Sequence, residues 1–123
     1  MKPGRKGVAR LWHATLYSWS GIRAAFQNEA AFRQEVMLVL LMTPVSFLIA
    51  TTLVEWLLLV VPLLLLLIVE LLNSAIESVV DRIGAEPHDL SGRAKDMGSA
   101  AVLFSLVLIA VTWIPMIWRL LHA

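Results

Sequence analysis

The sequence predicts an all-α membrane protein in which an amphipathic surface helix is followed by three transmembrane helices. Three observations lead to this fold. Hydrophobic residues make up 59% of the 123 residues and charged residues only 15%, whereas soluble domains have about 45–50% and about 25%. Residues 36–54 and 98–118 contain no charged side chain. Lysine and arginine are concentrated in the segments that flank these stretches. We expect one domain over residues 1–123.

Composition also excludes several classes of function. The chain has no cysteine, which rules out a disulfide framework, a thiolate nucleophile and a cysteine-ligated zinc ion. Its formal net charge is only +1, so nothing in the balance of charge indicates a nucleic-acid partner.

The first expected element is an interfacial helix over about residues 6–28. Its large apolar side chains recur at helical spacing, with polar side chains on the other faces. These apolar residues are Trp12, Leu16, Trp19, Ile22 and Phe26. The pattern predicts a helix that lies on the bilayer surface. A helix packed on a soluble core is the alternative, but the rest of the chain offers no such core.

Three membrane spans are expected at about residues 30–50, 54–83 and 93–121. The uncharged stretches 36–54 and 98–118 would measure about 28 and 31 Å as helices, close to the hydrocarbon thickness of about 30 Å. The middle stretch, 56–69, would measure only about 21 Å, so its helix must continue through Glu70 toward Gly84. Each span contains one proline that could kink it. These prolines are Pro44, Pro62 and Pro115.

Positive charge predicts the orientation of these spans. Six of the ten lysines and arginines precede the first span, and Arg82, Arg93 and Lys95 lie between the second and third. Both regions are therefore expected in the cytoplasm. Three tryptophans would then form an aromatic belt at the outer interface. They are Trp56, Trp113 and Trp118.

The second span carries a stripe of polar side chains at its cytoplasmic end. Glu70, Asn73, Glu77 and Asp81 are spaced so that they share one face of a helix. A carboxylate at membrane depth costs about 3 kcal/mol, so it needs a partner or a function. The stripe indicates either an active-site face or a polar seam between identical subunits. Three helices can hardly shield it alone, which predicts a helical oligomer.

Two other polar segments flank this stripe. Glu29 and Arg33 are four residues apart, which fits either an exposed helix ion pair or a cation site shared with Glu77 for a hard ion such as Mg²⁺. Residues 81–98 fit either a solvated loop or a phosphate site at the start of the third span. Asp89 or Ser91 could cap that helix. The small residues 98–101 would permit close helix packing.

Four stretches of the chain resemble the bacterial membrane diacylglycerol kinase family. They are residues 17–25, 28–35, 69–83 and 88–101. The resemblance implies a homotrimer of three-span subunits with active sites at subunit boundaries. It further implies ATP-dependent phosphorylation of diacylglycerol to phosphatidic acid with Mg²⁺, in the bacterial inner membrane with a cytoplasmic N-terminus.

The same resemblance assigns roles to individual residues. Glu70 would be the catalytic base, and Glu29 and Glu77 the Mg²⁺ ligands. The implied ATP contacts are Arg10, Tyr17, Glu29, Glu77, Glu86, His88, Lys95 and Asp96. The implied lipid-substrate contacts are Arg10, Trp19, Arg23, Ala31, Arg33, Glu35, Glu70, Asn73 and Ser99.

Two other functions remain open at this point. A kinase of the same fold that phosphorylates undecaprenol would have the same chemical residues. A small proton-coupled transporter component would also place a carboxyl group such as Glu70 beside Asn73 inside the membrane.

Overall fold

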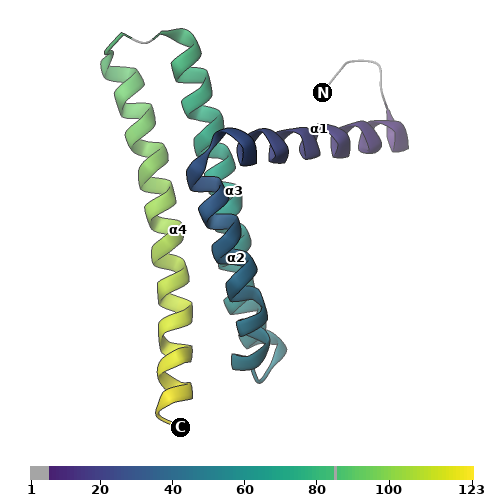
Figure 1. Cartoon of the computed structure of the whole chain (residues 1–123), viewed down its shortest axis with the longest axis vertical. Coiled ribbons are helices and arrows are strands. Elements are labelled where there is room, and N and C mark those ends of the chain that lie inside the picture. Colours follow the sequence, from purple (N-terminus) through teal and green to yellow (C-terminus); the bar gives the residue numbers. More distant parts are fainter. Residues whose placement is uncertain (1–5, 85) are drawn as a thin grey trace.

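The computed structural model describes residues 6–84 and 86–123, which form four helices: α1 (Gly7–Asn28), α2 (Ala30–Ile49), α3 (Leu53–Ile83) and α4 (Asp89–Leu121). α2, α3 and α4 run alongside one another, and α1 lies crosswise near one end of this bundle (Figure 1). Lys2 and Arg5, which contribute to the predicted cytoplasmic charge, lie outside the described residues.

α2, α3 and α4 are each long and apolar enough to cross a membrane. α2 has 20 residues, α3 has 31 and α4 has 33, which correspond to about 30, 46 and 50 Å. The two longer helices exceed the hydrocarbon thickness of about 30 Å. Both helices therefore extend beyond the apolar layer by several turns. The charged residues of the predicted site lie on these turns or close to them.

The chain bends sharply between α1 and α2 at Glu29. Its backbone is extended there (φ −118°, ψ 108°), which ends one helix and begins the next. The Arg33 guanidinium reaches back and donates to the carbonyl oxygens of Phe26 at 2.7 Å and Gln27 at 3.2 Å. These carbonyls end α1 and have no partner within the helix. Across the described residues, Arg33 does not form the helix ion pair with Glu29 that their spacing allowed.

The apolar core lies in the half of the bundle that is distant from α1. Its buried side chains come from all three long helices. They are Ile49, Leu59, Leu63, Leu66, Ile109 and Trp113. Leucines at positions 59, 63 and 66 recur at the spacing of one helix face, which explains why this face of α3 turns toward its neighbours.

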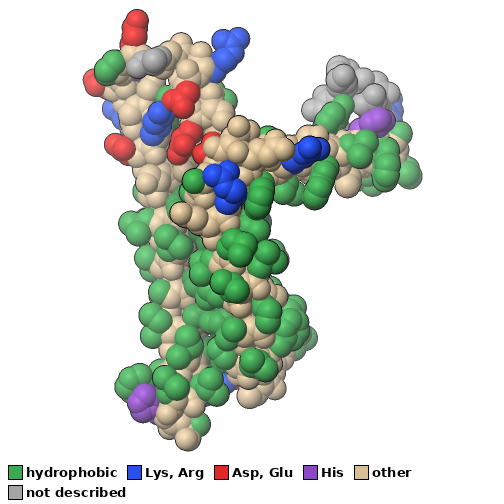
Figure 2. Space-filling model, viewed as in Figure 1, with side chains coloured by type: hydrophobic (Ala, Val, Ile, Leu, Met, Phe, Trp, Pro, Cys, Tyr) green, Lys and Arg blue, Asp and Glu red, His purple; other side chains and the backbone are tan. Residues whose placement is uncertain are grey.

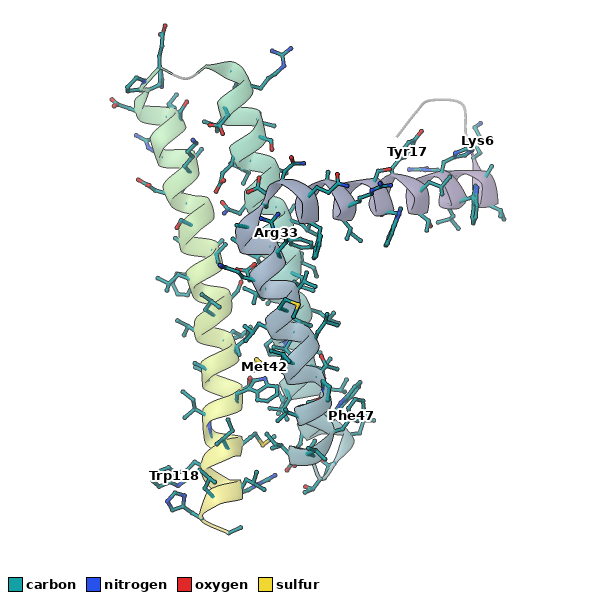
Figure 3. All side chains as sticks on the ribbon, in the orientation of Figure 1. Lys6, Tyr17, Arg33, Met42, Phe47 and Trp118 are labelled. Carbon is teal, nitrogen blue, oxygen red and sulfur yellow. The ribbon has the colours of Figure 1, made fainter. Side chains whose placement is uncertain are left out.

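The aromatic belt predicted from the tryptophans is wrong for one of them. Trp113 is only 4% exposed, and its indole N–H donates to the Leu59 carbonyl oxygen at 2.9 Å. It therefore joins α4 to α3 inside the core, because a buried indole N–H needs an acceptor. Trp118 is exposed and stacks on His122, and Figure 3 shows it at the end of the bundle farthest from α1.

The prolines do not interrupt the three long helices. Each helix continues through Pro44, Pro62 or Pro115. Two threonine hydroxyls lie next to the affected turns and bond to the backbone: Thr43 donates to Val39 O at 2.6 Å and Thr112 to Ile109 O at 3.1 Å. The carbonyls that Pro44 and Pro115 leave without an N–H donor are those of Leu40 and Val111, so these two bonds lie beside the freed carbonyls and do not satisfy them.

The end of the bundle farthest from α1 is closed by an ion pair. Arg119 of α4 binds the carboxylate of Glu55 on α3 through two nitrogens, at 2.6 and 2.8 Å. Thr51 also donates to Glu55 from its backbone and its hydroxyl, at 3.0 and 2.8 Å. The two-pronged geometry fixes the start of α3 against the end of α4.

At the opposite end, α3 stops at Ile83 and Gly84 follows as its cap. α4 begins at Asp89, four residues before the expected start at residue 93. The cap is His88, not Asp89 or Ser91: its Nδ1 accepts the Leu90 N–H at 3.1 Å. Figure 2 shows that charged side chains gather at this end, above a largely apolar shaft. α1 and the α3–α4 loop lie toward the same end (Figure 1), as the positive-charge pattern predicted.

We expect Trp113→Phe to lower the free energy of unfolding by about 1 kcal/mol, because the aromatic packing survives while the bond to Leu59 O is lost. Reversible unfolding in mixed micelles would measure the change. Trp118→Phe is the matched control, since Trp118 is exposed. Equal stabilities of the two variants would contradict a role for the indole bond.

Candidate active site

The stripe predicted on α3 runs from the interior of the bundle to its surface. Glu70 is 4% exposed and Asn73 8%, Glu77 is half-buried, and Asp81 is exposed. The carboxylates of Glu77 and Glu29 both lie near enough to Glu70 to act on it electrostatically. The structure thus gathers three carboxylates from α3 and the α1–α2 bend at one level of the bundle.

Glu70 is paired with a fourth carboxyl group, that of Glu35 on α2. The two groups lie close enough to act on each other, and Glu35 Oε2 is buried without a donor from the described residues. Two carboxyl groups this close can share a hydrogen bond only when one of them carries a proton. Glu35 was expected to contact lipid substrate; within one subunit it contacts the expected base.

Asn73 connects the buried and the accessible parts of the stripe. Its amide Nδ2 donates to Glu77 Oε1 at 3.1 Å. Its Oδ1 is buried and has no hydrogen-bond partner in the described residues. The amide therefore presents a donor to one carboxylate and leaves an acceptor directed into the interface between α3 and α4.

A hollow of about 540 Å³ lies between α1 and α3 beside Glu29. Its lining residues include Ser18, Ala25, Asn28, Glu29, Ser74 and Ser78. Most of these side chains are small, so α1 leaves space over the middle of α3. The volume is in the range of small-molecule sites, and Glu29 of the acidic cluster is part of its lining.

Half of the eight residues expected to contact ATP lie in the α3–α4 loop or in the first turns of α4. Glu86, His88 and Lys95 line one hollow of about 290 Å³. His88 and Asp96 line a second hollow of about 590 Å³. Lys95 forms an ion pair with Asp81 at 2.7 Å and lies near enough to Glu77 to be attracted by it. Electrostatic attraction therefore connects the start of α4 to the acidic stripe.

The other expected residues are dispersed. Arg10, Tyr17, Trp19 and Arg23 are exposed along α1, and Figure 3 shows Tyr17 well away from the bundle, with Arg33 at the bend. Ala31 and Ser99 are exposed on α2 and α4. Within the described part of the chain, α1 packs against α2 and α3 but not against α4. One subunit thus brings together Glu29, Glu35, Glu70, Asn73 and Glu77, but does not bring the α1 residues to the α4 residues.

Two residues of this region were not predicted as site residues. Ser74 is buried with an unpartnered hydroxyl and lines the hollow beside Glu29. Gly98 is buried against Asn73. Ser74 lies one helical turn after Glu70, so the stripe could have included it by spacing. Gly98 was noted from the sequence only as one of several small residues at the start of the third span.

Comparison with known proteins agrees with the geometry. The family model for prokaryotic diacylglycerol kinase matches residues 16–117. The chain is 52% identical over 112 residues to a diacylglycerol kinase of Escherichia coli K12, covering 91% of this chain and 92% of that one. It is 53% identical over 110 residues to one from Pseudomonas aeruginosa, covering 89% of each. A relative of the same name from Haemophilus influenzae is 47% identical over 107 residues, covering 87% of this chain and 91% of that one.

These matches extend over the α1–α2 bend, the acidic stripe of α3 and the α3–α4 loop, which together contain the carboxyl cluster and the two loop hollows. A phosphoryl-transfer enzyme with a lipid substrate is consistent with such a cluster at the end of three apolar helices. The chain belongs to the prokaryotic diacylglycerol kinase family.

Proposed function

We propose that this protein transfers the γ-phosphoryl group of ATP to the primary hydroxyl of diacylglycerol, which gives phosphatidic acid and ADP. The observation that carries the proposal is the buried Glu70, close to the half-buried Glu35 and beside the more accessible carboxylates Glu29 and Glu77. This arrangement provides a proton acceptor at membrane depth next to groups that face the phosphate of a water-soluble nucleotide. The reaction needs both kinds of group, because one substrate is a membrane lipid and the other is a water-soluble nucleotide.

Glu70 acts as the general base. As the lipid oxygen forms its bond to the γ-phosphorus, its O–H bond breaks and the proton passes to Glu70, while the bond from the γ-phosphorus to the β–γ bridging oxygen breaks and ADP leaves. The contact with Glu35 supports this role, because it fixes the Glu70 carboxyl group in one orientation. The hollow beside Glu29 is the proposed entry for the glycerol end of the lipid.

Mg²⁺ is proposed as the metal, with Glu29 and Glu77 as its ligands. No group of three acidic or histidine side chains within residues 6–84 and 86–123 is arranged to hold a metal ion by itself. Two carboxylates fit Mg²⁺ nevertheless, because this ion keeps waters and takes phosphate oxygens as its other ligands. When bound, it supplies positive charge to the β- and γ-phosphate oxygens.

The nucleotide is proposed to lie at the start of α4. Lys95 supplies a positive charge and already lies between two carboxylates of α3. The hollows lined by Glu86, His88 and Asp96 provide room beside it. Arg10 and Tyr17 of α1 complete the proposed set of contacts.

The active enzyme is proposed to be a homotrimer in the bacterial inner membrane, with its N-terminus in the cytoplasm. The separation of α1 from α4 within one subunit supports a site that is completed by a neighbouring subunit. An apolar hollow of about 410 Å³ between α3 and α4 leaves Asn73 close to a surface that a neighbour could cover. The charged end of the bundle carries Arg82, Arg93 and Lys95, which supports its position in the cytoplasm.

The lipid acceptor can be tested directly. Purified protein with Mg²⁺ and γ-labelled ATP should transfer label to dioleoylglycerol and not to undecaprenol. Label on undecaprenol alone would contradict the proposed acceptor while retaining the kinase. Absence of labelled lipid of any kind would favour the transporter alternative.

We expect Glu70→Gln to lower turnover by about 10²–10⁴, because the amide keeps the shape of the side chain but cannot accept the proton. Turnover at saturating lipid and Mg²⁺-ATP would measure this. ATP binding by calorimetry should be unchanged, since Glu70 is not assigned to the nucleotide. Near-normal turnover would exclude Glu70 as the base, and a parallel loss of ATP binding would move it to the nucleotide or metal site.

Glu29→Gln and Glu77→Gln should each raise the Mg²⁺ concentration needed for half-maximal activity, because each removes one anionic ligand. High Mg²⁺ should partly restore turnover in at least one variant. Asp81→Asn is the control, since Asp81 is exposed and paired with Lys95. An unaltered Mg²⁺ dependence in both glutamate variants would refute the metal assignment.

Chemical crosslinking in mild detergent should give monomer, dimer and trimer bands on a denaturing gel and no larger species. Mixing inactive Glu70→Gln subunits with subunits inactivated by Arg10→Ala on α1 should then restore part of the activity, because a shared site can combine the intact α3 of one subunit with the intact α1 of another. A fully active monomer would contradict the shared site.

A further inference from the structure

α4 lies directly against the acidic stripe of α3 at Gly98. A Cβ atom added there would overlap Asn73 Oδ1 and lie only 3.2 Å from Asn73 Cγ. The described glycines at positions 7, 21 and 92 have no neighbour within 4 Å of such an atom, and Gly84 has one only at 4.0 Å. Gly98 is thus required by its neighbour and not by its backbone conformation, which is ordinary helix.

The neighbour that requires it is the side chain that donates to Glu77. Asn73 is 8% exposed, with Nδ2 on Glu77 Oε1 at 3.1 Å and Oδ1 against Gly98. The amide is planar, so a group that displaces Oδ1 also displaces Nδ2. The opposite orientation of the amide would set an oxygen against the carboxylate, which has no donor to offer when ionised.

A second contact between the same helices lies beyond Glu77. Lys95 binds Asp81 at 2.7 Å. On α3, Glu77 lies one turn from Asn73 and one turn from Asp81; on α4, Gly98 and Lys95 lie about one turn apart. Glu77 therefore lies between two contacts that fix the register of α3 against α4. One is the close packing of Asn73 on Gly98, and the other is the ion pair of Lys95 with Asp81.

We propose that Gly98 is a positioning residue for Glu77: its lack of a side chain lets Asn73 hold the Glu77 carboxylate for the metal ion. The inference rests on the proposed function, in which Glu77 is a Mg²⁺ ligand. A side chain at position 98 would displace the amide end of Asn73, and Glu77 would then lose its donor.

The test compares Gly98→Ala with Gly92→Ala, a matched change on the same helix in open space. Binding of Mn²⁺ as a probe for Mg²⁺, with a non-hydrolysable ATP analogue, is followed by the paramagnetic resonance signal of free Mn²⁺. Gly98→Ala should raise the Mn²⁺ dissociation constant about tenfold, as expected when one hydrogen bond to a charged group is lost. Gly92→Ala should leave it unchanged.

Asn73→Ala separates positioning from packing. It removes the donor without an overlap, so it should weaken Mn²⁺ binding as much as Gly98→Ala does. The double variant Asn73→Ala/Gly98→Ala should recover the thermal unfolding midpoint of Asn73→Ala, because the overlap is gone, but not the Mn²⁺ affinity. If Gly98→Ala fails to fold, the Mn²⁺ affinity of Asn73→Ala and the unfolding midpoint of the double variant still test the inference.

Glu77→Gln distinguishes failure of this inference from failure of the proposed function. Unchanged Mn²⁺ binding in Glu77→Gln would overturn the metal assignment and this inference together. Weak binding in Glu77→Gln with normal binding in Gly98→Ala or Asn73→Ala would overturn this inference alone. A lowered unfolding midpoint in Gly98→Ala with normal Mn²⁺ binding would make Gly98 a packing residue only.

Discussion

Burial of the Glu70 carboxyl group among apolar helices is the constraint on which the rest of the structure depends. A carboxyl group at this depth is unfavourable unless it is paired or hydrogen-bonded. The partner, Glu35, comes from α2, so α2 must enter the bundle with its first turns against α3. That entry requires the bend at Glu29, where Arg33 satisfies the last carbonyls of α1. The same bend places Glu29 at the edge of the carboxyl cluster. It therefore both ends α1 and positions a candidate metal ligand.

Stability and chemistry are separated along the bundle. The main apolar cluster lies in the half distant from α1, together with the Trp113–Leu59 bond and the Glu55–Arg119 ion pair. The other half buries fewer apolar side chains, Ala25, Phe32 and Val80, and there the ion pair of Lys95 with Asp81 joins α4 to α3. In lipid there is little hydrophobic driving force between helices, so close packing and hydrogen bonds decide how they associate. A site end held by polar contacts can change its shape for substrate while the far end keeps the helices together.

The sequence was sufficient for the architecture because its signals are periodic or cumulative. Uncharged stretches predicted three spans, and the structure has three helices long and apolar enough for them. The spacing of Glu70, Asn73, Glu77 and Asp81 predicted a shared face, and their graded burial follows from it. What the sequence could not supply were single contacts between distant residues. Four such contacts depend on how separate segments are placed relative to one another, which no local pattern encodes. They are the cap of α1 by Arg33, the burial of Trp113, the cap of α4 by His88 and the ion pair of Glu55 with Arg119.

Gly98 illustrates the same limit at the site itself. Within the sequence it is one small residue at the start of a span, and small residues are common wherever membrane helices pack closely. Its meaning appears only when Asn73 is in position, because the space that a Cβ would fill is the space that the amide oxygen occupies. The amide lies between a helix surface and a carboxylate, and its orientation is determined by both. In this fold the candidate site residues are visible in the sequence as charged and polar side chains, whereas the close fit of Gly98 against Asn73 becomes visible only in the structure.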